Sequence, residues 1–149
     1  RNYLYIPINY LIMKDSSTFQ KLMSSVINIL ITLIIFIPFY FLVEETITRK
    51  FILIGIFFIY NFLFLVFNNS RCLGMIIMNT HYDKIHPKKN QLIYLILYTL
   101  SFSSLLFSVF FPFDLFIINM VLLQLPSIIL KKTTFHGYLS GNIKTVSNN

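Results

Sequence analysis

The chain has 149 residues, of which 56% are hydrophobic and 11% are charged, whereas about a quarter of the residues are charged in an ordinary soluble domain. A soluble domain of this length buries only ~70% of its unfolded surface, too little interior for 17 Phe, 9 Tyr and the many Ile and Leu. The composition therefore excludes an ordinary soluble fold and predicts that a lipid bilayer covers the apolar surface. The net charge of +7 indicates anionic lipid headgroups as partners, and because the basic residues are scattered we expect no nucleic acid.

Four apolar segments are predicted to cross the membrane as helices. They are residues 22–43, 51–67, 92–110 and 115–130. The first two are separated by a short charged connection. The last two come from one apolar block, residues 91–130, which would be about 60 Å long as a single helix, twice the ~30 Å hydrocarbon core. Pro112 and Asp114 place the break, because proline stops one helix and aspartate can cap the next.

The distribution of basic residues predicts the topology. Ten of the twelve Lys and Arg lie in the N-terminal segment, the central polar segment 68–90 or the tail 131–149, and the other two are Arg49 and Lys50. By the positive-inside rule, both termini and the central segment are cytoplasmic. The predicted fold is an all-α membrane protein, a single domain over residues 1–149, with four transmembrane helices in two hairpins and a small cytoplasmic cap.

The cap is expected to form from the central segment and the tail. Leu73–Met78 is too short to span, and a helix or turn there would present Leu73, Ile76 and Ile77 to the headgroup layer, either as an anchor between the hairpins or as a gate or docking element. Gly74 is expected to permit close backbone packing. Residues 79–82 and 143–146 are expected to run extended and to pair as a two-stranded ribbon.

No set of catalytic or metal-binding residues is visible in the sequence, so we expect neither an enzyme nor a cofactor. His81 and His86 are five residues apart, which is poor spacing for one helix face, and no Cys or Glu stands at ligand spacing. His136 is instead expected to hydrogen-bond to the central segment. Cys72, the single cysteine, is either a palmitoylation site or a buried thiol.

Four amide side chains fall within the predicted spans. They are Asn28, Asn61, Asn119 and Gln124. Two interpretations stay open for them. They line a path through the membrane, or they hydrogen-bond between helices, which contributes about 0.6 kcal/mol each.

Three segments of the chain resemble the RDD family of small membrane proteins over about residues 18–147. At the position of Lys21 the family has arginine, and at that of Asn28, seven residues later, it has aspartate. Cys72–His81 resembles the family's glycine-centred run. Thr134–Val146 resembles its closing His-Asp-Leu-Leu-Ser-Gly. The positions that match the family's motifs are Lys21, Asn28, Leu73, Gly74, Met75, His136, Gly137, Ser140 and Gly141.

The resemblance implies a multi-pass protein of the bacterial inner membrane that acts as a transporter or as a permease-like component. The family's naming Arg, Asp and Asp positions are Lys21, Asn28 and Gly137 here, so the predicted spans contain no carboxylate. An ion exchanger needs an ionisable group at membrane depth. A non-catalytic structural or accessory subunit of a larger membrane complex therefore stays open beside a transporter working as a homo-oligomer.

Overall fold

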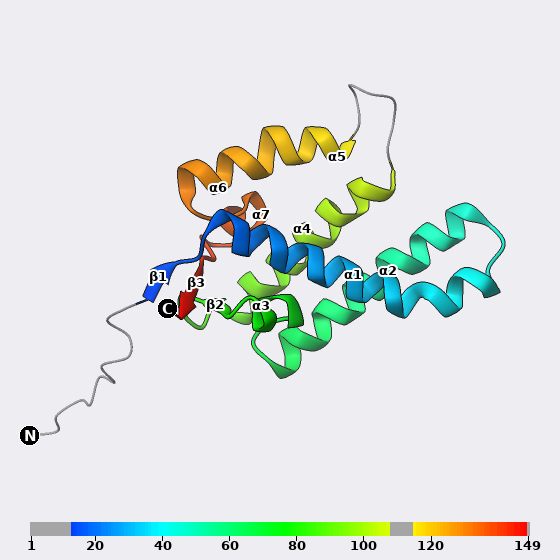
Figure 1. Ribbon diagram of the computed structural model, residues 1–149, viewed down its shortest axis with the longest axis horizontal. Helices are drawn as coiled ribbons and strands as arrows, with labels where there is room; N and C mark the ends of the chain where they lie inside the picture. Colours follow the sequence, from blue (N-terminus) through cyan, green and yellow to red (C-terminus); the bar gives the residue numbers. More distant parts are fainter. Residues whose placement is uncertain (1–12, 108–114, 149) are drawn as a thin grey trace, which may run out of the picture.

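The computed structural model describes residues 13–107 and 115–148, which form a mostly helical protein with a small sheet (Figure 1). The break predicted at Pro112 and Asp114 lies outside these residues. The helices are α1 (Thr18–Leu42), α2 (Thr46–Phe67), α3 (Leu73–Ile77), α4 (Lys88–Leu106), α5 (Leu115–Ile118), the π-helix η2 (Asn119–Gln124), α6 (Leu125–Lys131) and α7 (Phe135–Leu139). The strands are β1 (Met13–Asp15), β2 (Thr80–Tyr82) and β3 (Thr145–Asn148).

Helix α1 begins four residues before the predicted first span, because a capping box fixes its start. The Ser17 hydroxyl accepts a hydrogen bond from the Gln20 backbone N–H (3.1 Å), and the Gln20 side chain accepts one from the Ser17 backbone N–H (2.9 Å). This reciprocal pair satisfies two backbone donors that the first helical turn leaves unpaired. The whole helix has 25 residues and includes Pro38.

Helix α2 also begins earlier than predicted and takes in most of the charged connection, so that only residues 43–45 separate it from α1. The two cations in its first turns lie over aromatic rings. The Arg49 guanidinium is 4.3 Å from the Tyr40 ring centroid, and the Lys50 ammonium is 5.1 Å from that of Phe107. Such cation–π contacts stabilise positive charge beside apolar surface. The second span is therefore 22 residues long rather than the minimal length expected.

Among the described helices, only α1 and α2 are long and apolar enough to cross a membrane by themselves, where four such spans were expected. Helix α4 has 19 residues, but its start at Lys88 and Lys89 and its Ser and Thr residues make it more polar. The fourth segment is a shorter apolar stretch of α5, η2 and α6. The Leu125 N–H bonds to Met120 O, five residues back, next to Pro126, which has no N–H to donate.

The predicted pairing of the central segment with the tail is confirmed. Strand β2 pairs antiparallel with β3, with His81 opposite Val146. A third strand that the sequence did not predict, β1, pairs with the other edge of β3, placing Lys14 opposite Ser147. The sheet order is therefore β1-β3-β2, and we refer to this sheet together with α3 and α7 as the cap. The cap lies at one end of α1 and α2, and the turn between these two helices lies at the other (Figure 1).

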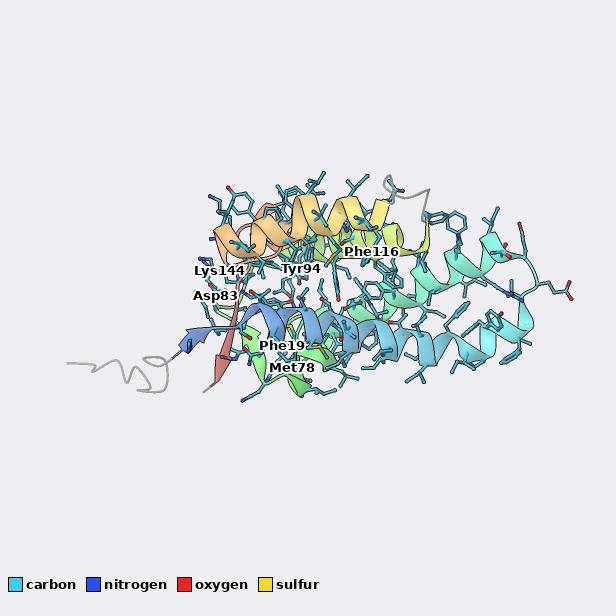
Figure 2. The ribbon with its side chains drawn as sticks, turned by 45° about the horizontal axis from the view of Figure 1, so that its top comes forward. Phe19, Met78, Asp83, Tyr94, Phe116 and Lys144 are labelled. Carbon is cyan, nitrogen blue, oxygen red and sulfur yellow. The ribbon has the colours of Figure 1, made fainter. Side chains whose placement is uncertain are left out.

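The helices pack around a small aromatic core. Phe57 of α2 is fully buried and stacks on Phe102 of α4, with 4.1 Å between ring centroids, and Phe36 and Leu53 complete the cluster. The outer faces of α1 and α2 remain apolar and exposed, and Figure 2 shows this hairpin projecting beyond the other helices. Only 11% of the most apolar stretch of α1 is buried, unlike the core helix of a soluble protein.

Candidate functional site

Asn28 joins three helices at the base of the cap. Its side chain is 2% exposed, and its Oδ1 accepts hydrogen bonds from the Gly74 backbone N–H (2.9 Å) and from the Tyr60 hydroxyl (3.2 Å). Its Nδ2 donates to Cys72 Sγ (2.8 Å). One amide of α1 thus bonds to α2 and to both the first turn and the N-cap of α3. Sequence reasoning singled out Asn28 and Gly74 but did not identify Tyr60 or Cys72 as partners.

Gly74 is required by the close approach of α3 to α1, as the sequence predicted. A Cβ at this position would lie 2.1 Å from the Ser24 carbonyl oxygen and 2.8 Å from Asn28 Oδ1. Both distances are far below normal contact, and the nearer atom belongs to backbone. The short helix α3 leaves Leu73, Ile76 and Ile77 exposed, which is the apolar face expected of it.

Lys21 connects the start of α1 to the end of α6. Its ammonium donates to the Lys132 carbonyl oxygen (2.5 Å), and Lys132 is the left-handed C-cap residue of α6, with φ of 60°. A cation at a helix C-terminus pairs with the unsatisfied carbonyl groups there and interacts favourably with the helix dipole. Lys21 therefore has a structural role, linking α1 to the end of α6.

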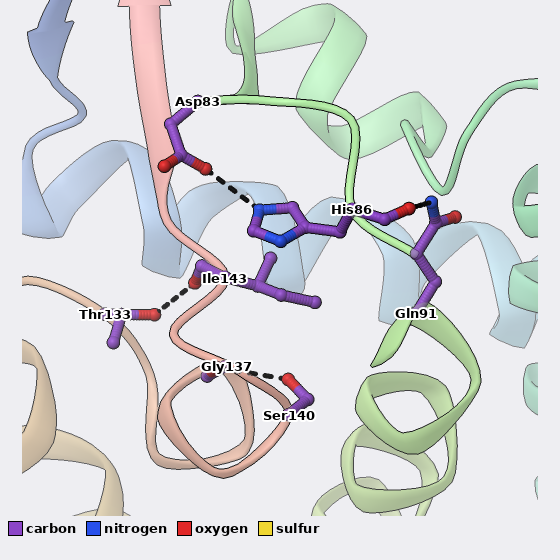
Figure 3. A network of polar contacts seen from close by, with 7 residues as sticks. All are labelled: Asp83, His86, Gln91, Thr133, Gly137, Ser140 and Ile143. Atoms are coloured by element: carbon purple, nitrogen blue, oxygen red, sulfur yellow. Dashed lines mark hydrogen bonds and ion pairs between the residues drawn. The ribbon is translucent and has the colours of Figure 1, made fainter. Parts of the chain in front are cut away.

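The tail folds back tightly through α7. The Gly137 carbonyl accepts bonds from the Ile143 N–H (2.8 Å) and from the Ser140 hydroxyl (3.1 Å), as Figure 3 shows for Ser140. A Cβ on Gly137 would lie 2.5 Å from Thr133 Oγ1, so no side chain fits there without a shift. Gly141 supplies the positive φ of 103° at the following turn.

The prediction that His136 hydrogen-bonds to the central segment is wrong. Its ring packs against those of Tyr94 and Tyr98, with centroids 4.8 Å and 5.1 Å away, and neither ring nitrogen has a partner among the described residues. Burial lowers the pKa of His136 to about 3, because the charged form would lose its hydration. His136 is therefore a neutral aromatic packing residue of the cap.

The other three amides within the predicted spans differ in what they bond to. Asn119 Nδ2 donates across to Ser101 Oγ of α4 (2.6 Å), and Gln124 Oε1 accepts from the Phe135 N–H of α7 (3.2 Å). These two amides link helices. Asn61 Nδ2 bonds instead to Phe57 O in its own helix (2.8 Å). Hydrogen bonding between helices therefore describes Asn119 and Gln124 but not Asn61.

Three segments distant in sequence, Lys21–Asn28, Cys72–His81 and Thr134–Val146, converge on one cavity of about 50 Å3 beneath the cap, where polar and apolar side chains are mixed. Its lining includes Lys21, Ser24, Ser25 and Asn28 of α1, Asn61 of α2, Ser70, Cys72, Met75 and Thr80 of the central segment, Tyr94 and Tyr98 of α4, and Thr133, Thr134, Ile143 and Thr145 of the tail. About 15 Å3 suffices for one water, so the cavity has room for about three. The Tyr98 hydroxyl, buried without a partner among the described residues, gives a water there a hydrogen bond to make.

The lining has one basic side chain, Lys21, and no carboxylate. Cys72 is buried, and burial raises the pKa of its thiol, so it is neither nucleophilic nor accessible to a lipidating enzyme in this conformation. No three His, Cys, Asp or Glu residues of the described chain lie close enough together to bind a metal ion. The cavity is thus suited to hydrogen-bonding a small neutral or anionic group.

Comparison with known proteins gives no match: no family model, no curated protein and no solved structure is similar to this chain. Its function therefore has to be inferred from the cavity, the helices and the sequence.

Proposed function

We propose that this chain is a four-span integral membrane protein of the RDD type that works as a small transporter, and that its solute occupies the cavity beneath the cap. The observation that supports this proposal is the convergence of three distant segments on one small cavity that carries hydroxyl and amide groups, between helices whose outer faces are apolar. The proposal assigns no catalytic step to the protein.

The membrane position is supported by length and charge. Helices α1 and α2 meet the length and hydropathy needed for spanning. Helix α4, at 19 residues, and the 17-residue stretch Leu115–Lys131 would cover about 28 Å and 25 Å, close to the ~30 Å hydrocarbon core. Lys21 and Lys132 meet at the cap, while Arg49 and Lys50 lie at the far ends of α1 and α2, which fits a cytoplasmic cap.

The chemistry of the lining limits the solute. Carboxylates are the usual side-chain ligands of Ca²⁺ and Mg²⁺ and the usual carriers of an exchanged proton, and the lining has none. Hydroxyls, amides and the Lys21 ammonium can instead donate hydrogen bonds to a small inorganic anion or to a neutral solute such as urea. Because the enclosed volume is only about 50 Å3, the described conformation holds at most such a small solute.

Flux into proteoliposomes tests this proposal. Chloride entry is followed by quenching of trapped lucigenin, urea entry by light scattering and potassium entry by a trapped indicator. We expect chloride or urea to enter at least tenfold faster than into protein-free liposomes, and potassium not to do so.

Two variants and one matched control test whether the solute passes through this cavity. Asn28→Leu removes the amide beside the cavity, and Ser25→Leu fills the cavity while leaving Asn28 in place; both should lower flux about tenfold. Asn119→Leu makes the same exchange at a residue that does not line the cavity, so its flux should match the parent protein. Transport through this cavity is excluded if neither solute enters faster than in protein-free liposomes, or if Ser25→Leu, eluting as a folded species, transports normally.

An accessory-subunit role is the second candidate, because large apolar side chains remain exposed on the α1–α2 hairpin. Among them are Ile34 (65% exposed), Phe41 (79%), Leu42 (78%) and Phe67 (82%). Such a face suits lipid or the helices of another subunit equally. Purification of the tagged chain from its native membrane in mild detergent separates the two: a homo-oligomer supports transport, and isolation only within a heteromeric complex supports the accessory role.

A further inference from the structure

A second cavity, of about 290 Å3, lies next to the first, with which it shares the side chains of Ser70, Tyr82, Tyr94 and Ile143, but it contains more charged residues. It lies where the end of α2, strand β2 and the start of α4 meet, and its lining is Asn68, Asn69, Ser70, Arg71, His81, Tyr82, Asp83, Lys84, Ile85, His86, Gln91, Tyr94 and Ile143. Two basic side chains, Arg71 and Lys84, therefore line one hollow.

Arg71 is held in place but not neutralised. Its Nε donates to the Thr80 carbonyl oxygen (3.1 Å), which fixes the guanidinium against β2. No carboxylate pairs with Arg71 or Lys84 in the described part of the chain, where Asp83 contacts His86 instead. A guanidinium anchored through Nε still presents its other N–H groups, and their fork geometry matches the oxygens of a phosphate.

The one acidic residue in the lining is already engaged. Asp83 Oδ1 lies 3.0 Å from His86 Nε2, and the His86 carbonyl accepts a hydrogen bond from Gln91 Nε2 (2.6 Å), as Figure 3 shows. Gln91 Oε1 accepts in turn from the Ser70 hydroxyl (2.9 Å). This chain of contacts orients the Asp83 carboxylate toward His86, so the lining keeps a net positive charge.

Two further features indicate what occupies the cavity. His81 Nδ1 is buried and has no partner in the described chain, so this wall offers an unused hydrogen-bonding atom. Ile85, also in the lining, is 82% exposed and gives the rim an apolar edge. A volume near the lower end of the ~300–1,000 Å3 typical of ligand sites suits a head group rather than a nucleotide.

We propose that this cavity is a binding site for a phosphate group, and that its source is the head group of an anionic phospholipid, with Arg71 and Lys84 on the phosphate and Ile85 toward the lipid glycerol. This site rests on the membrane position proposed for the chain but not on transport. The apolar helix α2 ends at Phe67, next to Asn68 in the lining, and this places the cavity at headgroup depth in that orientation.

Native mass spectrometry of the full chain in detergent tests the site. The probes are dioctanoyl phosphatidic acid, dioctanoylglycerol, which lacks the phosphate, and inorganic phosphate. We expect a one-to-one adduct with dioctanoyl phosphatidic acid and at least tenfold weaker binding of dioctanoylglycerol and inorganic phosphate.

The variants separate the cavity from general surface charge. Lys84→Gln and Arg71→Gln should each weaken the phosphatidic acid adduct about tenfold. Lys89→Gln removes the same charge from an exposed residue outside the lining and should leave it unchanged. The Lys84 side chain is exposed and makes no hydrogen bond in the described chain, so its variant should fold even if Arg71→Gln does not. Equal losses in Lys84→Gln and Lys89→Gln overturn the proposed site, and inorganic phosphate binding as tightly as phosphatidic acid overturns the lipid assignment.

Discussion

Replacing Gly74 by alanine should separate α3 from α1. The new Cβ would lie 2.1 Å from the Ser24 carbonyl oxygen, whereas a carbon–oxygen contact is normally about 3.3 Å, so the two backbones must part by about 1.2 Å. That shift would stretch the 2.9 Å bond from the Gly74 N–H to Asn28 Oδ1 beyond hydrogen-bonding range. Overpacking costs about 1–3 kcal/mol, and a buried donor left unpaired costs about 1–3 kcal/mol more. We therefore expect a loss of about 2–6 kcal/mol in the free energy of unfolding.

The assay uses Cys72, the single cysteine of the chain, which is 6% exposed and lies beside Gly74. In mild detergent its reaction with a maleimide should be slow in the parent protein and at least tenfold faster in Gly74→Ala. Denaturant titration of the same samples gives the stability change. Gly55→Ala is the matched control, because a Cβ there meets nothing within 4 Å and alanine favours a helix interior. If Gly74→Ala labels and unfolds like the parent protein, the packing of α3 on α1 is not as described.

Three further predictions concern the cap and the helix contacts. His136→Phe should remove part of the acid sensitivity of the protein. The pKa of His136 is about 3 in the folded state, below its ordinary 6.5, so the unfolded chain binds the proton first. The stability of the parent protein therefore falls as pH drops from about 6.5 toward 3. Thermal unfolding at pH 7 and pH 4.5 measures this, and an equal drop in both proteins would contradict it. Lys21→Met should cost about 0.5–1 kcal/mol through loss of the bond to Lys132 O, and Lys21→Arg should restore most of it; identical unfolding midpoints for the two variants would show that no charge is needed there. Asn119→Leu should lower stability more than Asn61→Leu, by about 0.6 kcal/mol, because only Asn119 bonds to a neighbouring helix; the reverse order in denaturant titration would argue against that assignment.

Much of the cap could be predicted from sequence because its contacts use backbone groups and glycine. The extended segments at β2 and β3 and the short α3 follow from polar breaks and from runs too short to span. The start of α1 could also have been found, since Ser17 and Gln20 have capping-box spacing. Strand β1 could not, because three polar-flanked residues form a strand only when a partner edge is present.

The cavity and the surroundings of His136 depend on side-chain packing, which the hydrophobic periodicity of the sequence does not specify. The sequence shows that Asn28 and Gly74 are polar or small but not that Tyr60 reaches the same amide from α2. His136 has two hydrogen-bonding nitrogens, and only the position of the Tyr94 and Tyr98 rings shows that they remain unpaired. The backbone hydrogen-bond pattern also changes to that of a π-helix at η2, just before Pro126, which has no N–H to donate.

The position of β3 between β1 and β2 has a consequence for the order of assembly. Met13 pairs with Asn148 and Thr80 with Ser147, so both pairings wait for a strand that follows every helix in the chain. Contacts so far apart in sequence are slow to form because loop closure costs entropy before the contact repays it. The long helices can be in place while the sheet is still open, and the compartment under it stays accessible to water until β3 docks. Closing that compartment therefore depends on the docking of β3 between β1 and β2.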